Sequence, residues 1–84
     1  MERTIIRTDG TQDIVEVGDG FEAWNKAIGA RTGEIVASPC GQVELWCDEE
    51  GLFTNEPQLN RAASLLTMRP IVGNVIMFYP GDIK

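Results

Sequence analysis

The residues of this chain with the most chemical potential lie between 46 and 61. Three carboxylates, Asp48, Glu49 and Glu50, stand together before Gly51. This density of negative charge suits a solvated turn at the end of a strand, a carboxylate that pairs with Arg61, or a hard-cation site. The spacing does not fit an EF-hand loop and no further ligand set is evident, so we predict no metal site.

Arg61 stands in an unusual place for a cation. Asn60 is a good N-cap, and a short helix is expected to run from it through Ala62, Ala63, Leu65 and Leu66. Arg61 then falls in the first turn, where the helix dipole disfavours positive charge. We therefore expect a compensating anion, which Glu49 or Glu50 or a bound phosphate or carboxylate could supply.

The two cysteines do not indicate catalysis. Cys40 falls in a predicted turn and Cys47 far along the following strand, so their side chains should not meet in a disulfide. The chain contains no histidine to activate either thiol, and it has no glycine-rich phosphate loop. We expect two free thiols, no catalytic residue, no cofactor and no enzymatic activity.

The elements that would position these residues follow from hydrophobic patterning. Two β-prone stretches flank Asp9-Gly10, which predicts a hairpin with a tight primed turn. Asp19 and Glu22 stand in a capping-box relation before a helix that Gly29 should end. Further strands are expected at 34–37, 42–47 and 71–79. The last is apolar on both faces and therefore either central or covered by a partner, with a bulge or close backbone approach at its glycine.

The two tryptophans receive different predictions. Trp24 shares one helical face with Phe21 and Ile28, so it should anchor the core while Asn25 points to solvent. Trp46 alternates onto the strand face that carries Glu44, which would otherwise be exposed. It either covers the sheet edge or belongs to a contact surface.

Composition predicts one small domain that spans residues 1–84. The chain is 43% hydrophobic and 24% charged, with no long apolar span or leader, which favours a soluble, cytoplasmic protein without a membrane partner. A net charge of −6 argues against direct nucleic-acid binding. We expect an α+β fold, with a mainly antiparallel sheet of about five strands and two short helices, that could self-associate as a homodimer.

The order of these parts resembles a known family. Glu49-Glu50-Gly51, Asn60-Arg61-Ala62 and the glycine-interrupted last strand are similar to domain of unknown function 3846, which is common in bacteriophages and mobile elements. Where that family usually has asparagine before the two glutamates, this chain has Asp48. The resemblance implies a small early-expressed factor that acts on the host cell, in the host cytoplasm.

Three functions remain open from the sequence. The first is a binding protein that modulates or inhibits a host or defence protein, with Trp46, Leu52 and Phe53 as apolar anchors and Glu49 and Glu50 as a steering rim. The second is a sponge for a nucleotide-like signal, held at Arg61. The third is an acidic mimic of DNA that blocks a DNA-binding enzyme.

Overall fold

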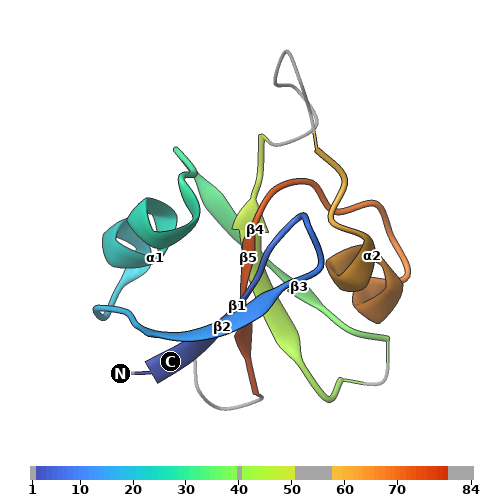
Figure 1. Cartoon of the computed structure of the whole chain (residues 1–84), viewed down its shortest axis with the longest axis horizontal. Helices are drawn as coiled ribbons and strands as arrows, with labels where there is room; N and C mark the ends of the chain where they lie inside the picture. The colour runs from blue at the N-terminus through green and yellow to red at the C-terminus, as the bar shows by residue number, and fades with distance from the viewer. Residues whose placement is uncertain (1, 40, 51–57, 80–84) are drawn as a thin grey trace.

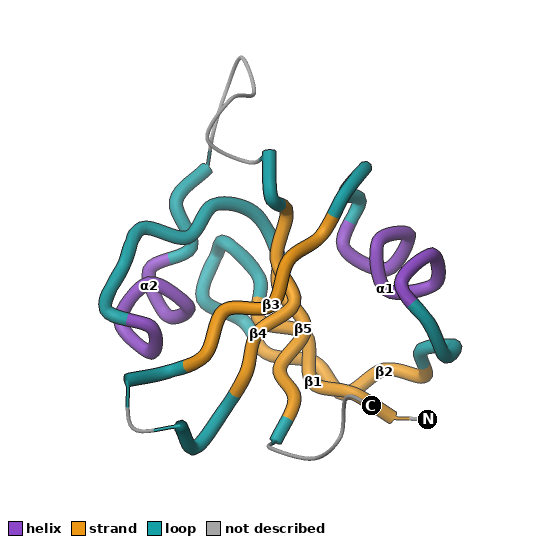
Figure 2. Tube along the Cα trace, turned by 180° about the vertical axis from the view of Figure 1, so that it is seen from behind, coloured by secondary structure: helices purple, strands orange, loops and turns teal. Residues whose placement is uncertain are grey.

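The chain folds into an antiparallel sheet with one helix on each face (Figures 1 and 2). The computed structural model describes residues 2–39, 41–50 and 58–79. Along the chain the elements are β1 (Glu2–Ile6), β2 (Gln12–Glu16), α1 (Phe21–Ile28), β3 (Gly33–Ala37), β4 (Glu44–Asp48), α2 (Arg61–Thr67) and β5 (Val75–Phe78). The five strands lie in the order β2-β1-β5-β4-β3. The predicted α+β class is confirmed.

The first hairpin forms as predicted, but its turn is wider. The Arg7 N–H donates to the Thr11 carbonyl at 2.9 Å, and the Gly10 N–H donates to the Arg7 carbonyl at 3.0 Å. This is a three-residue loop with Gly10 at φ 90°, not a two-residue primed turn. The Asp9 carboxylate accepts from the hydroxyl and the N–H of Thr11, which lowers its pKa and stabilises the wider loop.

Strand β5 is central, one of the two placements that its apolar faces predicted. It pairs with β1 on one side and β4 on the other. The regular strand is shorter than predicted because Gly73 takes φ 85°, and before it Val72 forms only an isolated bridge with Leu59. The expected close approach at Gly73 is wrong, since a Cβ there would meet open space; the glycine serves the backbone conformation instead.

Alternate residues of the strands supply two separate cores. The core beneath α2 contains Ile6, Val36, Leu45, Cys47, Ala63, Ile71 and Val75. The core beneath α1 contains Ile5, Val17, Trp24, Trp46, Ile76 and Phe78. The central strands are therefore buried on both faces, as the period of two in their side-chain directions requires.

Helix α1 covers the strand face that the sequence assigned to solvent. Trp46 is only 5% exposed there, stacked on Phe21 and in edge contact with Trp24. Its Nε1–H donates to Asn25 Oδ1 at 2.8 Å, so Asn25 faces the sheet and not solvent. The helix ends at Gly29 as predicted, but its N-cap is Gly20 without a side-chain hydrogen bond, so the predicted capping box is absent.

Helix α2 is fixed to the sheet through its N-cap. Asn60 Oδ1 accepts from the Ala63 N–H at 3.1 Å, which confirms the predicted cap. The same amide donates through Nδ2 to the carbonyls of Ile6 and Gly73, at 3.0 and 2.9 Å. One fully buried side chain thus joins α2, β1 and the segment before β5.

Candidate functional site

The structure separates the residues that the sequence grouped into one site. Trp46 lies in the core beneath α1, so its role as an exposed anchor for a partner is not supported. Glu49, Glu50 and Arg61 are exposed. Leu52 and Phe53, the other predicted anchors, lie outside the described residues.

The acidic turn after β4 is built by its own hydrogen bonds. Asp48 Oδ1 accepts from the Glu50 N–H at 2.9 Å. The Glu49 N–H donates to the Thr32 carbonyl at 3.0 Å, which extends the β3–β4 pairing by one bond. Asp48 therefore shapes the turn, as aspartate commonly does. Among residues 2–39, 41–50 and 58–79, no group of three or more potential metal ligands comes together.

Arg61 does not pair with the acidic turn. It is exposed at the start of α2, and within the described part of the chain no ion pair links it to Glu49 or Glu50. One ion pair of the described residues joins Arg7 Nε to Asp13 Oδ2 at 2.9 Å, in the first hairpin. Of the two expected sources of a compensating anion for Arg61, the pairing with Glu49 or Glu50 is not found among the described residues, and the bound phosphate or carboxylate stays a prediction.

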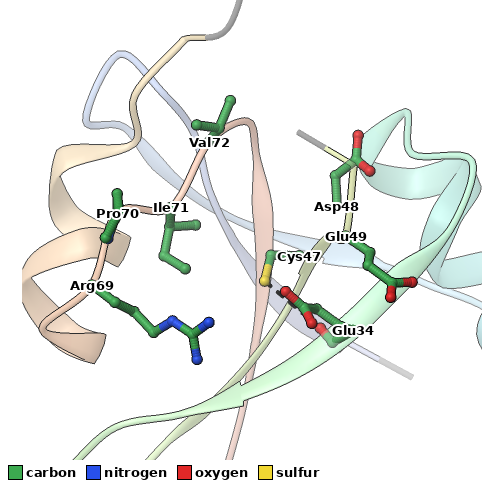
Figure 3. Close-up of a pocket in the computed structure, with 8 residues that line it drawn as sticks. All are labelled: Glu34, Cys47, Asp48, Glu49, Arg69, Pro70, Ile71 and Val72. Atoms are coloured by element: carbon green, nitrogen blue, oxygen red, sulfur yellow. Dashed lines mark hydrogen bonds between the residues drawn. The ribbon is translucent and has the colours of Figure 1, made fainter. Parts of the chain in front are cut away.

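A small pocket lies between the end of α2 and strands β3 and β4 (Figure 3). Its volume is about 60 Å³, and its lining consists of Glu34, Cys47, Asp48, Glu49, Arg69, Pro70, Ile71 and Val72. The Arg69 side chain extends toward Cys47 and Glu34. The space holds about two water molecules, and drug-sized ligands need several-fold more.

The Cys47 thiol in this pocket is held in its neutral form. Burial, then the nearby Glu34 carboxylate, raises its pKa from 9.0 to about 11, an effect that Arg69 partly offsets. The thiol donates a weak hydrogen bond to the Glu34 carbonyl, with 3.7 Å between sulfur and oxygen. A protonated, bonded thiol is a poor nucleophile, so the pocket does not supply one at neutral pH.

The exposed side of α2 is unexpectedly apolar. Ala63 and Thr67 face the core, whereas Leu65 and Met68 are each 77% exposed and Leu66 is 38% exposed. We call Arg61, Leu65, Leu66 and Met68 the α2 outer face. Sequence reasoning placed the leucines in the helix but missed their exposure, because apolar residues on both sides leave no amphipathic pattern to read.

Charge is distributed unevenly along the chain. Residues 2–50 carry 11 Asp and Glu against four Lys and Arg, whereas residues 58–79 carry Arg61 and Arg69 and no carboxylate. The segment that contains α2 is therefore cationic in an otherwise acidic protein.

Comparison with known proteins gives one match. The family model described as Domain of unknown function (DUF3846) matches residues 1–83, which confirms the resemblance seen in the motifs. No curated protein and no solved structure matches the chain. Within the described residues, no helix has the length and hydropathy needed to cross a membrane.

Proposed function

Because the chain belongs to the family described as Domain of unknown function (DUF3846), whose function is not known, we propose a role from its own surface: it binds another protein through the α2 outer face. The observation that carries this proposal is the exposure of Leu65 and Met68, each 77%, on adjacent turns of one helix. Single exposed leucines are ordinary on protein surfaces. A cluster on one short helix is the kind of patch that marks interaction sites.

The energetics favour a contact at this face. Complete burial of a leucine or methionine side chain is worth roughly 1.5–3 kcal/mol. Two such residues and the half-exposed Leu66 would supply the apolar centre that small interfaces need. In our proposal these residues replace Trp46 as anchors, since its indole ring is already packed against Phe21 and Trp24.

The role that we propose is modulation of a host protein. In the setting that the phage resemblance implies, the partner is a host or defence protein in the cytoplasm, and binding alters or inhibits it. A protein of 84 residues with a docking helix suits inhibition by occupation of a partner surface. Glu49 and Glu50 are exposed in the turn after β4, and their charges would steer the encounter with the partner protein.

The proposal is tested by capture from a host lysate with two variants. Leu65→Glu combined with Met68→Glu should abolish capture of a specific protein, because two charges replace the apolar centre. Ile14→Glu is the matched control, since Ile14 is an exposed apolar residue on edge strand β2, away from α2. Equal capture by wild type, the double variant and the control would contradict the proposal, provided that circular dichroism shows all three folded.

A second candidate is mimicry of DNA, which the charge of residues 2–50 favours. Their 11 carboxylates and four cations would present a polyanion to a DNA-binding enzyme. Competition with a DNA duplex for the captured host protein distinguishes the two. Mimicry predicts displacement of the DNA that survives Leu65→Glu with Met68→Glu, whereas docking through α2 predicts that it does not.

A further inference from the structure

We infer that the segment docking on the α2 outer face belongs to a different protein and is both apolar and acidic. This inference rests on the proposed function and specifies the chemistry of its partner. The starting observation is the uneven charge of the chain: residues 58–79 contain Arg61 and Arg69 and no carboxylate. A partner that matched the acidic remainder would be basic; a partner for α2 has to carry the opposite charge.

Arg61 lies in the same stripe as the apolar residues. Positions 61, 65 and 68 are separated by four and three residues, so their side chains share one side of the helix. Arg61 is exposed, and neither Glu49 nor Glu50 pairs with it. A carboxylate of a docked segment would complete this stripe and would also offset the unfavourable place of a cation in the first helical turn.

A second arginine follows the end of α2 but does not share its outer face. Met68, in the left-handed conformation at φ 57°, ends α2, and the exposed Arg69 follows it directly. Its guanidinium extends from the helix end over the pocket toward Glu34 and Cys47. The positive charge of the α2 outer face is therefore that of Arg61, at the N-terminal end of its apolar residues. An amphipathic segment with a carboxylate near one end of its apolar stripe fits this arrangement.

The same charges disfavour a second copy of this chain as the occupant. A two-fold contact between two α2 helices is isologous, so each helix meets its own surface. Such a contact would leave Arg61 of each copy without a carboxylate from the other α2 segment, since residues 58–79 contain none. A partner that supplies a carboxylate has the complementary charge that a second copy of α2 lacks. The α2 face is therefore assigned to a different protein, not to a homodimer.

The test is selection from a random peptide library displayed on phage, because it reports the preferred chemistry without a named partner. Wild-type protein is the target, and the Leu65→Glu/Met68→Glu variant is used to remove peptides that bind elsewhere. We expect the remaining peptides to combine Asp or Glu with Leu, Ile or Phe. Synthetic versions should bind about fivefold more weakly to Arg61→Gln, in line with the value of an exposed ion pair.

The ionic-strength dependence of peptide binding and a matched control variant complete the test. Binding should weaken as ionic strength rises from about 0.05 M to about 0.5 M, which screens exposed charges, and Ile14→Glu should bind like wild type. Peptides that depend on Leu65 and Met68 but are neutral or basic would overturn this inference and leave the proposed function standing. The absence of any peptide that depends on those two residues would overturn both. A dimer in light scattering that Leu65→Glu converts to monomer would overturn the assignment to a different protein.

Discussion

At the scale of single residues, Gly33 and Trp46 depend on each other. Gly33 begins β3 at the edge of the sheet, and a Cβ built on it would overlap the indole ring of Trp46. The ring cannot easily move aside, because Phe21 stacks on it and Asn25 accepts its N–H. The glycine is therefore required by the space that the indole fills and not by a left-handed backbone.

Gly33→Ala is expected to destabilise the protein by about 1–3 kcal/mol, the usual cost of overpacking a filled site. Chemical denaturation monitored by tryptophan fluorescence measures the free energy of unfolding. Trp46→Phe provides the control background, since a smaller ring leaves room for the new methyl group. The explanation fails if Gly33→Ala costs as much in that background as in wild type.

Cys47 gives a second prediction, based on its raised pKa. In a Cys40→Ser background, where one thiol remains, disulfide reagents at pH 8 should react far more slowly with folded protein than with protein in urea, because the buried thiol has a pKa of about 11. The raised pKa favours the folded state while the thiol is neutral in both states. This stabilisation is complete below pH 9 and is lost progressively as the pH rises from 9 toward 11.

Two measurements check the Cys47 prediction. The first compares reaction rates of the folded and urea-unfolded Cys40→Ser protein; equal rates at pH 8 would show that the thiol is accessible. The second follows stability against pH. Cys40→Ser should lose more stability above pH 9 than the Cys40→Ser/Cys47→Ala variant, which has no thiol to ionise.

The residue patterns predicted which face of an element a side chain lies on more accurately than they predicted which residues surround it. The alternation of β4 correctly placed Trp46 on the face opposite to Leu45 and Cys47. It could not show that α1 covers that face, because the local pattern of a strand does not indicate which distant segment packs on it. The source of the anion expected beside Arg61 could not be predicted for the same reason, since the helix dipole indicates that an anion is favoured but not which residue or ligand supplies it.

At the scale of elements, the docking of α2 depends on one amide. Asn60 caps the helix through Oδ1 and donates twice through Nδ2, so its buried side chain makes three hydrogen bonds. Ser64 adds a second link, since its hydroxyl donates to the Asn60 carbonyl at 2.7 Å and accepts from the Ile71 N–H at 2.9 Å. The sequence predicted the cap; the bonds to Ile6 and Gly73 required the fold.

Asn60→Ser and Asn60→Asp separate the capping of α2 from the two hydrogen bonds that Asn60 donates to the carbonyls of Ile6 and Gly73. Serine keeps a cap acceptor but removes both donors, which should cost about 2–3 kcal/mol because two carbonyls lose their partners. Aspartate keeps the shape and the cap but directs negative charge at the same carbonyls, so it should cost more than serine at pH 7. Thermal unfolding of the two variants measures this order. An equal or smaller loss for Asn60→Asp would mean that the two carbonyl bonds contribute little.

At the scale of the whole molecule, one sheet serves two cores. Trp24 of α1 and Trp46 of β4 pack together on one face of the sheet, and Ala63 of α2 packs on the opposite face of the same strands. Side chains of β5 alternate between the cores, with Val75 in one and Ile76 in the other. Each core therefore loses buried side chains if β5 is not in the sheet.

We therefore expect the protein to unfold in one cooperative transition. Tryptophan fluorescence, which reports on the α1 side, and far-ultraviolet circular dichroism, which reports on all elements, should give the same denaturation midpoint. Asn60→Ser, on the α2 side, should shift both midpoints equally. A fluorescence midpoint that stays at the wild-type value while the dichroism midpoint falls would show that the α2 layer unfolds by itself.

The general architecture could be predicted because strong local signals agree with it. Glycine signals placed the first hairpin and the end of α1, the Asn60 cap placed the start of α2, and the two-sided apolar character of β5 agrees with its place inside the sheet. The exposed face of α2 could not be predicted, since Leu65 and Leu66 look the same in sequence whether they face the core or solvent. Membership of a family of unknown function adds no chemistry, so the proposed docking site comes from side-chain exposure and charge alone.

The sheet order also has a consequence for synthesis on the ribosome. Strand β5 lies between β1 and β4, yet it follows every other strand along the chain. The β1–β2 and β3–β4 hairpins can each pair as they emerge, since their contacts are local. They cannot join into one sheet until β5 leaves the exit tunnel. A nascent chain halted before Val75 would therefore present two hairpins with unprotected apolar faces and exposed inner edges, a form that chaperones and proteases recognise.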